Sequence, residues 1–72
     1  MSKETIIRAM DAAGYTYDEL ESSDNWVRFF YDFGTVSFDN WDEVNDWLNG
    51  VVFDDHDTAE KVEKILREGA IA

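Results

Sequence analysis

Carboxylates are the most numerous of the side chains in this sequence that are able to take part in chemistry. The 72 residues include 17 Asp and Glu against 6 Lys and Arg, and the formal net charge is −11. A close pair of carboxylates can act as general acid and base if a pocket shields it from water. With so many carboxylates in a short chain, close pairs arise by chance, and a core of this size leaves little room for such a pocket. We therefore expect no enzymatic activity from them.

A metal site is the second chemistry to consider. His56 lies inside the acidic run Asp54-Asp55-His56-Asp57, and Glu60 follows one helical turn later. The run lacks the alternating ligands, the glycine and the bidentate Glu at position twelve of an EF-hand loop. The chain has no Cys, which excludes disulfides, thiolate catalysis, Cys-type zinc sites and iron–sulfur clusters. The pattern is more typical of a helix N-terminus, and we predict no metal and no cofactor.

Two further motifs match catalytic ones only in their letters. Asp32-Phe33-Gly34 is a tripeptide of protein kinases, but the other kinase motifs are missing. Ser22 and Ser23 have no candidate base except His56 and no nucleophile-elbow context. The sequence therefore predicts a binding protein and not an enzyme.

The acidic residues are concentrated in the middle of the chain. The formal charge is +1 for residues 1–8 and +1 for residues 61–72. Residues 9–60 contain 14 carboxylates and a single basic residue of the Lys or Arg type, Arg28, so their formal charge is −13. A surface chosen only for solubility usually mixes both signs. We therefore predict that a partner contacts these carboxylates. They fall into three clusters: Asp18, Glu19, Glu21 and Asp24; Asp39, Asp42, Glu43 and Asp46; and Asp54, Asp55 and Asp57.

The second cluster should form a stripe along a helix, because its members are spaced i, i+3, i+4 and i+7. Repulsion costs roughly 0.2–0.5 kcal/mol per close pair, and hence about 1–2 kcal/mol for the four pairs. The helix macrodipole offsets this by about 0.3–1 kcal/mol for each carboxylate of the first turn, but not for Asp46. A capped and solvated helix face remains the alternative interpretation of this cluster.

Capping residues and hydrophobic spacing predict the elements that position these clusters. Ser2 and Gly14 bracket a first helix, and Asn40 with Glu43 matches the capping box of a second. Asp57 with Glu60 gives a similar capping pattern for a third helix, which Gly69 should end. Strand-forming residues on both sides of a glycine-containing loop predict a hairpin. The predicted elements are a helix at 3–13, an edge strand within 15–21, strands at 26–31 and 35–38, and helices from 39 or 40 to 50 and from 57 to about 68.

This order of elements predicts an α+β fold. One domain, residues 1–72, should contain a small antiparallel sheet of two or three strands and three helices, in the order α-β-β-(β)-α-α. The apolar linker 51–53 should tuck under the core. Three Trp, three Tyr and five Phe distinguish the chain from a disordered acidic segment. Its apolar runs are too short to span a membrane, and its first residues favour a cytoplasmic protein without a leader.

Some of the aromatic residues are candidates for contact with a partner. The strand at 26–31 carries large side chains on both faces, and a sheet that is covered on one side buries only one face. Phe33, at the hairpin tip, and Trp47, at the margin of the second helix, are the proposed surface anchors, since aromatic residues are favoured in binding hot spots. The alternative is that so small a core uses all of them.

In size, acidity and lack of Cys, the chain resembles the small acidic anti-CRISPR and anti-restriction proteins of phages, several of which are DNA mimics. The acidic stretches 39–46 and 54–57 carry this resemblance, and the class has no diagnostic motif. It implies an inhibitor whose acidic surface occupies a basic nucleic-acid-binding site of a bacterial defence complex, such as a CRISPR effector or a restriction enzyme. Duplex DNA carries one negative charge per roughly 1.7 Å of helix axis. A dense surface of carboxylates would take the place of these charges in the basic site and so exclude the target DNA.

Two alternatives stay open. The first is a small accessory or regulatory protein, antitoxin-like, that binds a protein partner through an exposed aromatic patch without nucleic-acid mimicry. The second is a domain from a salt-adapted proteome, against which the Lys residues and the many large aromatic residues argue. Direct binding to nucleic acid is excluded, because phosphate would be repelled by most of this surface. The sequence does not give the identity of the partner or the oligomeric state.

Overall fold

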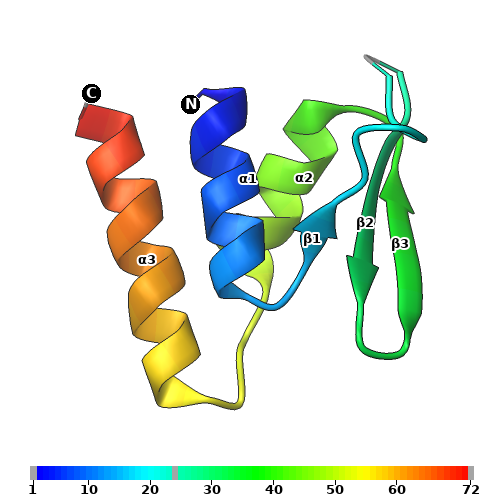
Figure 1. Ribbon diagram of the computed structural model, residues 1–72. Helices are drawn as coiled ribbons and strands as arrows, with labels where there is room; N and C mark the ends of the chain where they lie inside the picture. Colours follow the sequence, from blue (N-terminus) through cyan, green and yellow to red (C-terminus); the bar gives the residue numbers. More distant parts are fainter. Residues whose placement is uncertain (1, 24, 72) are drawn as a thin grey trace.

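The computed structural model describes residues 2–23 and 25–71. In these residues the chain forms three helices and one three-stranded antiparallel sheet (Figure 1). The predicted α+β class and the predicted order of elements are confirmed, and the third strand is present. The elements are α1 (Lys3–Ala12), β1 (Thr16–Tyr17), β2 (Val27–Tyr31), β3 (Gly34–Phe38), α2 (Trp41–Gly50) and α3 (His56–Ile71).

The strands lie in the order β1-β2-β3, with β2 in the centre. Tyr17 of β1 is opposite Phe29, and Val27 is opposite Phe38 of β3. Because both neighbours run antiparallel to β2, the end of β1, the start of β2 and the end of β3 share one end of the sheet. The hairpin loop lies at the other end, and there the positive φ of +145° falls on Gly34, the first residue of β3.

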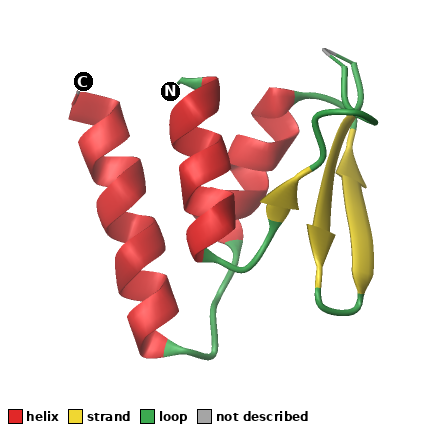
Figure 2. Cartoon of the chain, in the orientation of Figure 1, coloured by secondary structure: helices red, strands yellow, loops and turns green. Residues whose placement is uncertain are grey.

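The helices cover one face of the sheet and leave the other face open (Figure 2). Side chains of β2 alternate accordingly, so that Val27 and Phe29 are buried while Phe30 is exposed. Helix α1 lies between the sheet and α3 (Figure 1). The core combines residues of all three helices with β2: Ile6, Ala9, Met10, Val27, Phe29, Val44, Leu48 and Val62.

The first two helices begin at the predicted caps. Ser2 Oγ accepts a hydrogen bond from the Thr5 N–H (3.2 Å), and Asn40 Oδ1 accepts one from the Glu43 N–H (2.9 Å). The Glu43 carboxylate reaches back and accepts from the Asp39 N–H (2.9 Å), which completes a capping box. Beyond α1, Gly14 has a φ of +94°, a backbone conformation that favours glycine.

The third helix differs from its prediction at both ends. It begins at His56, because Asp55 and not Asp57 is its cap: Asp55 Oδ2 accepts from the Thr58 hydroxyl (2.8 Å) and Oδ1 from the Asp57 N–H (3.2 Å). It continues through Gly69, which packs against Thr5 of α1 and does not end the helix. The prediction that the apolar linker tucks under the core is wrong for Val52, which is 88% exposed.

Candidate protein-binding surface

Two of the three acidic clusters meet at one end of the sheet. Glu19 and Glu21 follow β1, and Asp39 follows β3, so the antiparallel register brings them to the end where β2 begins. Asp42 and Glu43 stand in the first turn of α2, which starts there. All five are exposed. We call this group the acidic end: Glu19, Glu21, Asp39, Asp42 and Glu43.

The other predicted carboxylates are not part of this group. Asp46 is exposed one turn further along α2. Asp54, Asp55 and Asp57 are also exposed, but they precede and open α3 at the opposite end of the molecule (Figure 1). Asp24 lies outside the described residues. The structure therefore divides the predicted acidic surface into two separate patches.

Asp18 is a correction to the predicted surface. Only 6% of it is exposed, its Oδ2 lies 3.8 Å from Nε of Arg28, and its Oδ1 accepts from the Glu21 N–H (3.2 Å). The side chain holds the β1–β2 connection in place and is not available to a partner. Arg28, the one Lys or Arg of the central segment, was the sequence signal for this pair. Arg28 lies in a strand next to the edge strand and is half-buried. Because burying an unpaired charge is costly, such a cation needs a nearby carboxylate.

The acidic end has little neutralising charge. In the described chain, the ion pairs of Lys and Arg are Arg28 with Asp18 and Arg67 with Glu63, so neither neutralises the acidic end. Lys3 Nζ lies over the rings of Tyr17 (5.9 Å) and Trp41 (5.2 Å) and forms no ion pair with a described carboxylate, although its positive charge offsets part of the field near α2. Apart from Asp18, every described carboxylate of residues 9–60 is exposed. The field of this surface is therefore available to a cationic partner.

Two exposed carboxylates also have local roles. Glu43 closes the capping box of α2, as described above. Hydrogen bonds from the Thr58 hydroxyl and from the Asp57 backbone N–H lower the pKa of Asp55 below its ordinary value. Asp42 and Asp46 form no side-chain hydrogen bond with another described residue, so substitutions there leave the caps intact.

The two predicted aromatic anchors belong to one continuous row of packed rings, in which Trp47 also contacts Phe38 of the core side (6.0 Å between ring centroids). Phe33 is 92% exposed at the hairpin tip, and its ring centroid lies 6.2 Å from that of Tyr31. Tyr31 packs on Tyr15 (5.3 Å), and Tyr15 packs edge-on against Trp47 of α2 (5.4 Å). Trp47 is half-buried in this arrangement. We call Phe33, Tyr31, Tyr15 and Trp47 the aromatic row.

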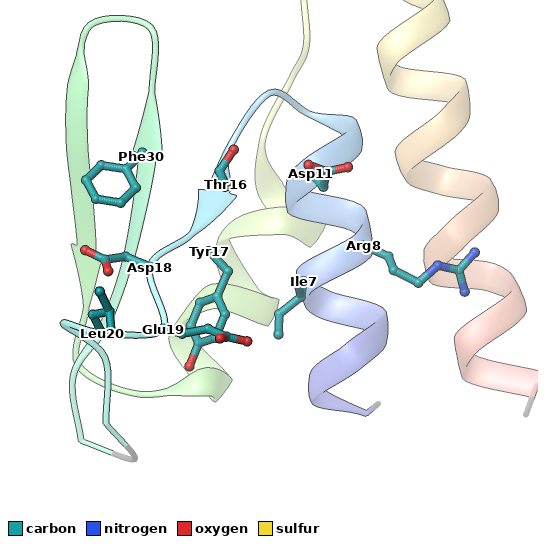
Figure 3. Close-up of a pocket in the computed structure, with 9 residues that line it drawn as sticks. All are labelled: Ile7, Arg8, Asp11, Thr16, Tyr17, Asp18, Glu19, Leu20 and Phe30. Carbon is teal, nitrogen blue, oxygen red and sulfur yellow. The ribbon is translucent and has the colours of Figure 1, made fainter.

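An open groove of about 550 Å³ runs across β1, between α1 and the uncovered face of the sheet (Figure 3). Its two most exposed apolar residues, Leu20 and Phe30, are not among the predicted contact residues. Leu20 is the one apolar residue between Asp18 and Asn25. An isolated apolar residue in a polar loop could have indicated a contact with a partner. The groove is lined by Ile7, Arg8, Asp11, Thr16, Tyr17, Asp18, Glu19, Leu20 and Phe30.

No three His, Cys, Asp or Glu side chains of the described residues are grouped so as to hold a metal ion. Within the same part of the chain, no helix combines the length and the apolar character that a membrane span requires. Comparisons of the sequence with known protein families and with curated proteins, and of the chain with solved structures, find no match.

Proposed function

We propose that this protein binds a basic, nucleic-acid-binding site of a protein partner and excludes nucleic acid from it. The observation that carries the proposal is the acidic end, where two clusters that are distant in sequence lie together, exposed and without a Lys or Arg ion pair among the described residues. A cationic groove that binds phosphates also attracts such a surface, because the positive potential of the groove is complementary both to phosphates and to carboxylates.

The partner on this proposal belongs to a bacterial defence system, with a CRISPR effector or a restriction enzyme as the leading candidates. This follows the resemblance of the chain to acidic phage inhibitors. The negative charge that would take the place of a phosphate backbone comes from Asp42 and Glu43 in the first turn of α2, from Asp46 one turn later, and from Asp39, which precedes the N-cap Asn40. Glu19 and Glu21 extend this charge across the end of the sheet.

The test begins with a pull-down from bacterial lysate and continues with DNA competition on the recovered partner. The double variant Asp42→Lys with Asp46→Lys should weaken binding at least about tenfold and make it less dependent on salt. The matched control is Glu63→Lys with Glu68→Lys, which changes the net charge equally on α3, where both signs are present. Equal losses from both pairs, or a partner that binds DNA and this protein at the same time, would contradict the proposal.

The aromatic row supports a second candidate function, an accessory or regulatory protein that binds its partner without competing with nucleic acid. Phe33 is almost fully exposed and continuous with half-buried Trp47, as expected for a binding hot spot. On this alternative, Phe33→Ala abolishes partner binding, while the double variant of Asp42 and Asp46 binds normally and salt has little effect.

A further inference from the structure

Leu20 is the most exposed large apolar residue described, at 95%, and its position is fixed by its neighbours. Before it, the Asp18 N–H donates to the Arg28 carbonyl (3.0 Å) and Asp18 Oδ1 receives the Glu21 N–H. After it, Ser22 Oγ accepts from the Arg28 N–H (3.0 Å), in place of a strand partner. The loop is therefore hydrogen-bonded to β2 on both sides of Leu20. The Leu20 side chain points into solvent and does not pack in the core.

The groove beside Leu20 has apolar walls. Phe30, 45% exposed on the uncovered face of the sheet, and Leu20 form one side, and half-buried Ile7 of α1 contributes to the other (Figure 3). Its volume of about 550 Å³ falls in the range of roughly 300–1,000 Å³ that is usual for sites that hold a ligand group. Apolar walls that are carried on an anchored backbone favour a large apolar side chain, because the loop loses little backbone order on binding.

The charge around the groove defines what accompanies that side chain. Exposed Glu19, which follows β1, and exposed Asp11 of α1 line it, whereas Asp18 is already paired with Arg28. Arg8 also lines the groove, but its guanidinium points away from β1 (Figure 3). A cationic group next to the inserted side chain would therefore meet two carboxylates.

We propose that this groove binds a segment of the protein partner that carries a large apolar side chain with Arg or Lys on both sides. The inference rests on the proposed function in one respect, that the partner is basic, and Glu19 belongs both to the groove and to the acidic end. The apolar side chain packs against Leu20 and Phe30, and the flanking cations pair with Glu19 and Asp11. A second copy of this chain is a poor occupant, since each copy carries a net charge of −11.

The experiment titrates the full-length, ¹⁵N-labelled protein with three end-capped tripeptides, Arg-Leu-Arg, Arg-Ser-Arg and Glu-Leu-Glu, at 0.15 M salt. Arg-Leu-Arg should shift the amide signals of Ile7, residues 16–20 and Phe30, and bind at least about fivefold more tightly than Arg-Ser-Arg, because its leucine is buried. Glu-Leu-Glu should not bind. Equal affinity for the two Arg peptides, or shifts confined to other parts of the chain, would overturn the proposal.

The variant Leu20→Ser tests the wall of the groove, with Val52→Ser as its control. Both residues are almost fully exposed, at 95% and 88%, so neither substitution removes a core contact, and an unchanged amide spectrum elsewhere verifies the fold. The preference for Arg-Leu-Arg over Arg-Ser-Arg should disappear in Leu20→Ser and persist in Val52→Ser. A preference that survives Leu20→Ser contradicts the proposal.

These titrations contain no nucleic acid, so their failure is distinguishable from failure of the proposed function. If the leucine preference is absent but the protein still competes with DNA for the partner, only the proposed role of the groove is rejected. If the leucine preference is present but the protein does not compete with DNA, nucleic-acid mimicry is rejected and the groove remains as the proposed binding site.

Discussion

Asp18 and Glu19 are neighbours in the sequence, but their surroundings give them different tasks. Asp18 is buried against Arg28 and fixes a loop, whereas Glu19 is exposed on the groove and the acidic end. Glu43 both caps α2 and presents negative charge to solvent. Counting carboxylates along the chain therefore overstates the surface that a partner meets, because burial and local hydrogen bonds remove or constrain some of them.

Asp55 should display its local role in its titration. Its pKa is lowered by the Thr58 hydroxyl and the Asp57 N–H, contacts that are absent in the unfolded chain. Its contribution to stability is therefore complete above the ordinary Asp pKa and is lost as pH falls through the lowered, folded-state value. We expect Thr58→Val to raise the pKa of Asp55 toward its ordinary value, as measured by NMR pH titration of the carboxyl carbon. Thr58→Ser, which keeps the hydroxyl, should leave it low; an equal rise in both variants would assign the effect to another group.

The helices differ in how far the sequence alone predicts them. Helices α1 and α2 start at Ser2 and Asn40 because capping is a local interaction between residues three apart. The run Asp54–Asp57 offers several caps for α3, and the one used depends on where the preceding linker leaves the chain. The far end of α3 passes Gly69 because of its packing on α1, a contact that no local pattern contains.

The candidate surfaces were predictable only in part, for a related reason. The clusters, Phe33 and Trp47 are visible in the sequence as residue types and spacings. That two clusters meet while the third lies elsewhere depends on strand register and on the path of α2. The groove combines Leu20, Phe30 and Ile7 from three parts of the chain, so it exists only after β1 has paired with β2.

The packing of α3 on α1 makes Gly69 a sensitive position. A Cβ there would overlap most closely with the Cγ2 methyl group of Thr5, and would lie 2.8 Å from its Oγ1 and 3.0 Å from its Cβ. Helix propensity favours Gly→Ala by about 0.8–1.0 kcal/mol, but overpacking costs about 1–3 kcal/mol. We expect Gly69→Ala to lower the free energy of unfolding by about 1 kcal/mol net, as measured by urea denaturation.

Two comparisons isolate this contact. A Cβ at Gly50 would meet no atom within 4 Å, so Gly50→Ala should be neutral or stabilising. In a Thr5→Ala background, which removes both Oγ1 and the methyl group, the penalty of Gly69→Ala should shrink. A penalty of the same size in that background would mean that the two helices do not meet at these residues.

The concentration of negative charge on α2 should make the free protein less stable than the same fold would be without the repulsion between these carboxylates. Asp42 and Asp46 are one turn apart on α2, and the last turn of this helix has no basic residue to balance its dipole. Asp46→Lys replaces a repulsion by an attraction and should raise the free energy of unfolding by about 0.5–1 kcal/mol at low salt. The gain should largely vanish in 1 M NaCl, where the Debye length is about 3 Å. Glu63→Lys, in the middle of mixed-charge α3, replaces the ion pair with Arg67 by a repulsion and should bring no such gain.

The same Asp46→Lys protein then separates a binding surface from an ordinary solvated helix face. If the stripe serves a basic partner, the variant is more stable but binds the partner more weakly, and its binding is less sensitive to salt. If the stripe is only solvated, stability rises and partner binding stays as it was. The stability from urea denaturation and the affinity from a binding titration on one variant therefore change in opposite directions in the first case alone, because stability rises in both cases whereas binding weakens only if a basic partner contacts Asp46.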